Sequence, residues 1–119
     1  MDKNLTPMEK RVELSMLYDF YGELLKANQK QIFEDYVLND YSLTEIADDH
    51  GVSRQGIHDT VKRCTKQLEE YEEKLHLIER FQEAGNIVRQ IRMLSEGNQK
   101  SDMALQEIGK LSVQIEALL

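Results

Sequence analysis

Hydrophobic residues recur at helical spacing along most of the chain, which predicts an all-α protein. Thr6, Pro7 and Glu9 open the first predicted helix as a cap, a first-turn proline and the partner of a capping box. That helix is expected to run to about residue 25. Its apolar face comprises Val12, Leu14, Met16, Leu17, Phe20, Tyr21, Leu24 and Leu25.

Two further capping patterns predict short helices in the next part of the chain. Asn28 and Ser42 each stand three residues before a Gln or a Glu, as in a capping box. They predict helices over residues 28–38 and 43–49. The polar residues 39–41 between these helices are expected to form a turn.

From residue 54 onward, apolar positions alternate between spacings of three and four. They are Ile57, Val61, Cys64, Leu68, Tyr71, Leu75 and Ile78. The pattern predicts one helix from residue 54 to about residue 83, roughly 45 Å long at about 1.5 Å per residue. The helices before residue 54 are too few to cover this apolar seam along its whole length. Either the C-terminal segment or a second copy must cover the rest.

The C-terminal third predicts two more helices. Gly85–Asn86 is expected to break the chain, followed by a helix that ends at Gly97–Asn98. Ser101 or Asp102 then caps a last helix. The apolar positions of these two helices are Ile87, Val88, Ile91 and Leu94, then Leu105, Ile108, Leu111, Ile115 and Leu118. We therefore predict a helical domain over residues 1–80 and a helical appendage over 81–119.

Composition limits the class of protein. The chain has 119 residues with one Pro and six Gly, a balance that favours helices. No apolar run approaches the length of a membrane span and no apolar leader is evident, which predicts a cytoplasmic protein without membrane insertion. The single cysteine, Cys64, fits a reducing compartment. The net charge of −7 has the wrong sign for a simple nucleic-acid binder.

The distribution of charge matters more than its sum. Over residues 53–67, four bases stand against the single acid Asp59. A local positive strip on an otherwise acidic protein suits a nucleic-acid-binding protein that must not bind every polyanion.

The same region carries the pattern of a helix-turn-helix at about residues 42–68. Ala47 is small where the second helix crosses close to it, and Gly51 permits a left-handed turn. Ile46, Val52 and Ile57 are expected to wedge the two helices together. The motif resembles the last domain of sigma factors, with His50 and Thr60 standing where apolar residues are common. The predicted fold is therefore a sigma factor region 4-like bundle with a long recognition helix and C-terminal helices for packing or dimerisation.

The second helix of this motif carries the candidate nucleic-acid-binding residues. They are Ser53, Arg54, Gln55, His58, Lys62, Arg63 and Lys66. Ser53 caps the helix and leaves its first amides open to a phosphate. Arg54 and Gln55 can read guanine and adenine edges in the major groove, whereas the later bases suit phosphates.

Other reactive side chains are interpreted as structural. The three histidines lack companions at metal-ligand spacing, so no metal site is predicted. Cys64 lies on the apolar seam and is expected to be buried. The acids at positions 69, 70, 72 and 73 are expected to form a solvated face that repels DNA. The aromatic residues of the first 41 positions are expected in the core. We predict no catalytic residue, no cofactor and no enzyme activity.

Four blocks in order carry a resemblance to a known family. They are Phe20–Leu25, Asp40–Ala47, Val52–Gln55 and Leu68–Leu75. They resemble the YlxM family of Gram-positive bacteria, whose genes lie beside those of the signal recognition particle GTPase. The resemblance is close over residues 18–77. It implies a sigma factor region 4-like helical protein and a regulatory part in protein targeting. The family's pattern carries over to Ser53–Gln55, Lys62 and Arg63.

These observations predict a nucleic-acid-binding regulator that forms a homodimer through the long helix and the C-terminal helices. DNA is the first expected target, and the signal recognition particle RNA is the second. The alternative is an adaptor that binds a protein of the targeting machinery, such as its GTPase, without touching DNA.

Overall fold

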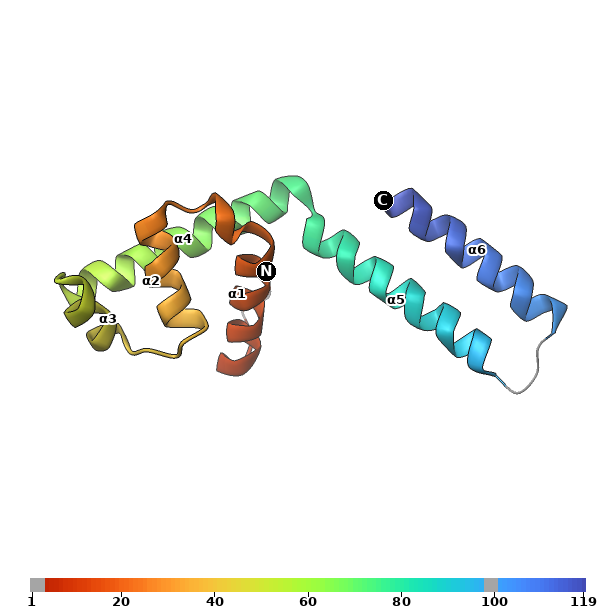
Figure 1. Ribbon diagram of the computed structural model, residues 1–119, viewed down its shortest axis with the longest axis horizontal. Coiled ribbons are helices and arrows are strands. Elements are labelled where there is room, and N and C mark those ends of the chain that lie inside the picture. Colours follow the sequence, from red (N-terminus) through yellow and green to blue (C-terminus); the bar gives the residue numbers. More distant parts are fainter. Residues whose placement is uncertain (1–3, 98–100) are drawn as a thin grey trace. The chain divides into compact units, whose positions relative to one another are not determined.

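The computed structural model describes residues 4–97 and 101–119, and the described residues form helices without any strand (Figure 1). In chain order the elements are α1 (Pro7–Tyr21), the 3₁₀ helix η1 (Gly22–Leu24), α2 (Ala27–Val37), α3 (Leu43–His50), α4 (Arg54–Leu75), α5 (Leu77–Glu96) and α6 (Asp102–Leu118). The prediction of an all-α helix-turn-helix protein is confirmed. The helices form two compact units, Met1–His76 and Leu77–Leu119.

Side-chain caps begin α1, α3, α4 and α6 as predicted. The hydroxyls of Thr6 and Ser42 each accept a hydrogen bond from the amide three residues later. Glu9 and Glu45 in turn accept the amides of these caps, which completes both capping boxes. Ser101 caps α6 by accepting the amide three residues on.

The end of α1 differs from the prediction. The helix stops at Tyr21 rather than near residue 25, and the chain continues as η1. A Cβ at Gly22 would lie 2.6 Å from the ring of Tyr18, so only glycine lets the backbone pass so close to that ring.

The start of α2 also differs. The helix begins at Ala27 with Lys26 extended in the cap position, so the predicted cap at Asn28 is wrong. Leu25 is buried, and its N–H donates to the Gly22 carbonyl at 3.1 Å. The burial and backbone bond of Leu25 fix the chain just before Lys26, so the helix can begin ahead of Asn28.

In the first unit, α1, α2 and α3 all pack against α4 (Figure 1). The largest fully buried side chains come from all four helices: Leu17, Tyr21, Phe33, Ile46, Ile57, Cys64 and Leu68. Burying an aliphatic side chain of this size contributes about 1.5–3 kcal/mol. Because three of these residues belong to the predicted seam of α4, the chain's own helices cover that part of the seam. Farther along, Leu75 is exposed.

The prediction of one helix from residue 54 to about residue 83 is wrong. α4 ends at Leu75, and His76 adopts a left-handed conformation with φ of 56°. The His76 N–H donates to the Glu72 carbonyl at 2.9 Å, which closes the helix end. Histidine is among the non-glycine residues that tolerate positive φ. The predicted break at Gly85–Asn86 lies inside α5, where glycine weakens a helix without ending it.

The second unit is an antiparallel hairpin of α5 and α6 (Figure 1). Ile87 of α5 and Leu111 of α6 are buried in it. Gly97 follows α5 as predicted, and Asn98 of the predicted break lies outside the described residues. Each helix of the described chain is too short or too polar to traverse a lipid bilayer.

Candidate nucleic-acid interface

The two helices of the helix-turn-helix, α3 and α4, meet through a small apolar cluster. Ile46 and Ala47 of α3 are buried together with Ile57 of α4. Ile32 of α2 completes the cluster, so α2 supports both helices from behind. The small side chain of Ala47 permits a close helix crossing, as its position in the sequence predicts.

The turn between these helices depends on a left-handed glycine. Gly51 has φ of 66°, and a Cβ there would meet no atom within 4 Å, so backbone conformation alone requires glycine. The next amide, that of Val52, donates to the Ala47 carbonyl at 3.1 Å. The predicted wedge is partly wrong, because Val52 is 51% exposed while Ile46 and Ile57 fill the contact. The backbone bond of the turn directs the Val52 side chain outward.

A buried carboxylate on α2 holds the C-terminal end of α3. Asp35 accepts hydrogen bonds from Gln31 Nε2 and Asn39 Nδ2, both at 3.1 Å. His50 Nε2 lies 3.6 Å from the other carboxylate oxygen of Asp35. This partner explains a polar side chain at position 50, where the motif commonly has an apolar one.

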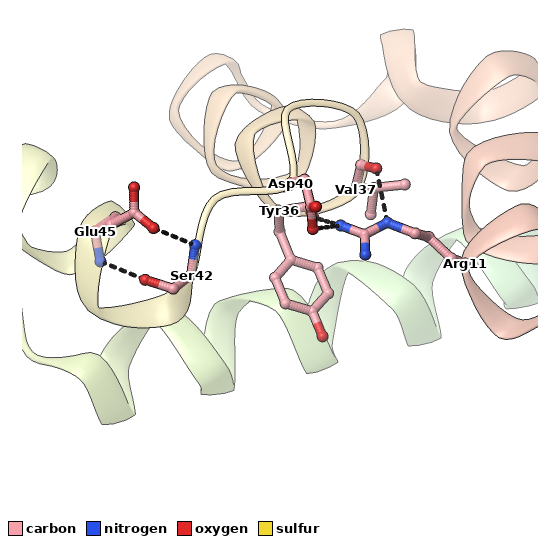
Figure 2. Close-up of polar contacts among 6 residues, drawn as sticks. All are labelled: Arg11, Tyr36, Val37, Asp40, Ser42 and Glu45. Atoms are coloured by element: carbon pink, nitrogen blue, oxygen red, sulfur yellow. Dashed lines mark hydrogen bonds and ion pairs between the residues drawn. The ribbon is translucent and has the colours of Figure 1, made fainter. Parts of the chain in front are cut away.

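Arg11 of α1 holds the connection between α2 and α3 (Figure 2). Its guanidinium donates to the carbonyls of Tyr36 and Val37 at 3.0 and 3.4 Å, and Nη2 lies 2.5 Å from Asp40 Oδ1. Asp40 has φ of 56°, which turns the chain toward the Ser42 cap. The predicted turn at residues 39–41 is thus present, and Arg11 of α1 holds it in place.

All seven predicted nucleic-acid-binding residues are exposed: Ser53, Arg54, Gln55, His58, Lys62, Arg63 and Lys66. The Ser53 hydroxyl caps α4 by accepting the Gly56 N–H at 3.0 Å. At about 100° per residue, the side chains that share one face span about 80° of the helix. They are Gln55, His58, Lys62 and Lys66, which we call the α4 strip. Arg54 and Arg63 project on opposite sides of this strip rather than within it.

Asp59 lies beside the α4 strip and binds two of its members. Its Oδ1 accepts a hydrogen bond from Gln55 Nε2 at 3.0 Å. His58 Nδ1 lies 3.7 Å from the same oxygen. In this conformation the Gln55 amide is therefore oriented by Asp59, and a base edge would have to compete for it.

A groove of about 660 Å³ runs along the edge of the strip. Its apolar lining comes from four helices, through Leu14, Tyr36, Leu43 and Val61. Its charged lining includes Lys62 and Lys66 of the strip, and Lys10 of α1. Lys10 was not among the predicted residues, because more than forty positions separate it from the strip and no local pattern connects them.

The acidic part of α4 begins where this groove ends. Lys10 Nζ lies 4.0 Å from Glu69, so part of its charge is compensated. One turn farther on, the Tyr21 hydroxyl donates to Glu72. Acids at these positions repel phosphates, so the surface suited to nucleic acid ends near Lys66.

Cys64 lies on the buried side of α4, behind the strip. Burial raises the pKa of its thiol above the ordinary 9.0, and the charge of Arg63 offsets a part of this shift. A buried, protonated thiol is a poor nucleophile and a poor metal ligand. Its predicted role as a small core hydrophobe is confirmed.

Comparisons with known proteins agree with this geometry. Residues 8–109 match a family described as "Putative helix-turn-helix protein, YlxM / p13 like" and named UPF0122. A UPF0122 protein of Bacillus licheniformis is 40% identical over 104 residues, which cover 87% of this chain and 97% of the relative. The UPF0122 protein YlxM of Bacillus subtilis is 40% identical over 95 residues, covering 80% and 86%. A relative from Thermoanaerobacter sp. is 52% identical over 79 residues, covering 66% and 68%.

The family match covers both helices of the motif and most of the chain. The predicted resemblance is therefore confirmed, and the chain belongs to the UPF0122 family of YlxM/p13-like helix-turn-helix proteins.

Proposed function

We propose that this protein is a regulator that binds duplex DNA by placing the first turns of α4 in the major groove. The observation that supports this most is the α4 strip with its flanking arginines, an exposed set of donors on the second helix of a helix-turn-helix. A helix with its side chains is about 10–12 Å across, which matches a major groove about 12 Å wide.

The proposal assigns different roles to the two ends of the strip, each taken together with the arginine beside it. Arg54 and Gln55 lie in the first turn and have the donors and acceptors that read base edges. Lys62, Arg63 and Lys66 lie about two to three turns later and neutralise phosphates. The capped N-terminus of α4 at Ser53 adds a weak positive dipole toward a phosphate.

Titration of duplex DNA at two salt concentrations tests this proposal. Neutralised phosphates release counterions, so affinity should fall as salt rises, and the logarithmic slope should become shallower by about 0.9 for each phosphate that a variant no longer neutralises. Replacing Arg54, Lys62 and Arg63 by Ala should abolish binding. A matched triple replacement of Lys74, Arg89 and Lys110 removes the same charge outside the strip and should leave most binding intact. Undetectable binding at low salt, or an unaffected Arg54/Lys62/Arg63 variant, would contradict the proposal.

The proposal extends to the signal recognition particle pathway through the resemblance to the YlxM family. The particle's RNA is the second candidate ligand, because proteins recognise RNA helices by backbone and shape more than by base edges. The same titration with this RNA separates the two. If the protein binds the RNA more tightly than mixed-sequence DNA at equal salt, the RNA and not DNA is the target.

The groove beside the strip favours a second candidate function, that of an adaptor. Its lining of Leu14, Tyr36, Leu43 and Val61 is suited to an apolar side chain of a partner protein such as the targeting GTPase. An adaptor would bind that GTPase with no dependence on Arg54. Replacement of Leu43 by Lys distinguishes the two candidates, since it should abolish GTPase binding and leave salt-dependent nucleic-acid binding in place.

The last part of the proposal is a homodimer formed through the C-terminal helices. Two copies present two α4 strips, as expected for a regulator that reads paired half-sites.

A further inference from the structure

The two helices of the second unit carry apolar sectors wider than a two-helix contact needs. The main apolar sector of α5 comprises Ala84, Ile87, Val88, Ile91 and Leu94, and that of α6 comprises Ala104, Leu105, Ile108, Leu111, Ile115 and Leu118. The exposed Met93, Met103 and Val113 lie outside these sectors. At about 100° per residue these sectors span about 120° and about 140°. A strict two-helix seam is narrower, whereas a helix in a bundle carries a sector of this width.

Both sectors extend toward the same side of the hairpin. Ile87 and Leu111 are buried and mark the direction from each helix to the other. Val88 and Leu105 are rotated from that direction by about 100° and about 120° in the same sense. In an antiparallel pair, equal rotations of this kind lead to one side of the pair. Val88 is 52% exposed and Leu105 is 61% exposed.

A hollow on the other side of the hairpin supports this assignment. It has a volume of about 290 Å³ and is lined by Gln90, Met93, Leu94, Glu107 and Leu111. Gln90 and Glu107 are rotated from the inward direction by about 60° and about 40° in the opposite sense. Their common hollow shows that equal rotations do reach one side of this hairpin.

The two sides differ in chemistry. The side of Val88, which we call the apolar face, comprises Ala84, Val88, Ile91, Leu105, Ile108 and Ile115, with Ser95 and Ser112 between them. Its charged residues, Arg92 and Glu116, lie at the margins. The opposite side carries Asn86, Arg89, Gln90, Gln106, Lys110 and Gln114, together with a few exposed apolar residues.

The centre of each apolar sector lies about 40° from the line that joins the two helices. In a square four-helix bundle the central axis lies at about 45° from the line between neighbouring helices. We propose that the apolar face packs on the same face of a second copy, so that two hairpins form a four-helix bundle. This inference rests on the homodimer of the proposed function and assigns its interface.

A second copy fits the apolar face better than an unrelated partner. Two identical hairpins with sectors in this direction close a bundle by a two-fold axis and leave no part of the sectors uncovered. The shared stretch of 17 residues is about 25 Å long and about 20 Å wide, a footprint of about 500 Å² per copy. This approaches the lower end of stable interfaces, about 600 Å² per partner.

The mass of the full chain in solution, measured by light scattering without nucleic acid, tests this inference. The wild type should have twice the 13.9 kDa of one chain. Replacing Val88 and Leu105 by Glu places charge on the apolar face and should give a monomer. The control replaces Met93 and Val113 by Glu, which are similarly exposed on other sides of the same helices, and should remain a dimer.

Circular dichroism and thermal unfolding complete the test. If the Val88/Leu105 variant loses helical signal, the dimer is judged instead from the wild type, whose melting temperature should rise with protein concentration. A monomeric wild type, or a Val88/Leu105 variant that stays dimeric, overturns the inference. Titration of DNA with the dimer and with the monomeric variant keeps the two proposals apart, since an absence of DNA binding in both overturns only the proposed function.

Discussion

His50 Nε2 lies 3.6 Å from Asp35 Oδ2, which joins the last turn of α3 to the last turn of α2. Asp35 is the one buried charged residue in the described part of the chain, and its carboxylate also accepts the side-chain amides of Gln31 and Asn39. The two amides orient the carboxylate by hydrogen bonds, and the contact with His50 joins the helix-turn-helix to α2, alongside the apolar contact with Ile32.

Replacement of Asp35 by Ala should lower the free energy of unfolding by about 1–3 kcal/mol, because Gln31, Asn39 and His50 are then left without a shared acceptor. Urea denaturation monitored by circular dichroism measures this decrease. Asp48 is exposed on α3, and its replacement by Ala should change stability by no more than about 0.5 kcal/mol. Equal decreases in both variants would show that the Asp35 network contributes nothing of its own.

Gly51 should be the least replaceable residue of the turn between α3 and α4. Its φ of 66° costs an alanine about 1–2 kcal/mol although there is space for a Cβ. Asparagine tolerates this conformation better, so Gly51→Asn should be more stable than Gly51→Ala. Thermal unfolding of the two variants tests the order, and a reversed order would mean that backbone strain is not the cause.

Asp59 should restrain nucleic-acid binding by the α4 strip. Its carboxylate orients the Gln55 amide and places a negative charge beside the basic residues of the strip. Asp59→Asn removes this charge and should tighten binding to duplex DNA at low salt by about fivefold, which corresponds to about 1 kcal/mol. Fluorescence anisotropy measures the change. Glu73→Gln removes the same charge beyond the strip and should have a smaller effect, so an equal gain would point to net charge alone.

Cys64 should react slowly with thiol reagents in the folded protein. Burial raises the pKa of the thiol above the ordinary 9.0, so less thiolate forms at pH 8 to 9 than in the unfolded chain. The raised pKa contributes stability below the unfolded value, and this contribution is lost as pH rises through the folded value. The rate of labelling with and without urea tests this, and equal rates would contradict burial at 0% exposure.

Local patterns in the sequence predicted much of the helix-turn-helix. The capping boxes at Thr6 and Ser42 and the left-handed Gly51 depend on neighbours within a few residues, so their signals are complete in the sequence. Helical periodicity likewise identified Ile57, Cys64 and Leu68 as buried. The exposure of the candidate binding residues follows from the same periodicity.

Long-range contacts account for the features that the sequence did not predict. Lys10 joins the groove beside the strip through the packing of α1 on α4, and His50 finds its partner on α2. The outward position of Val52 depends on a backbone bond in the turn, although an apolar residue there suggests burial. The bridging role of Asp59 depends on rotamers that spacing alone does not predict.

By itself, therefore, the sequence determined the capped starts of α1, α3, α4 and α6, the turn at Gly51 and the basic strip on α4, because each depends on the chemistry of a few consecutive residues. The tertiary structure decided where the long seam stops and what covers it. The seam continues through Ile78 as a pattern, yet the helix ends at Leu75 because His76 turns left-handed. The first helices of the same chain cover its N-terminal half, since only packing determines which apolar faces meet.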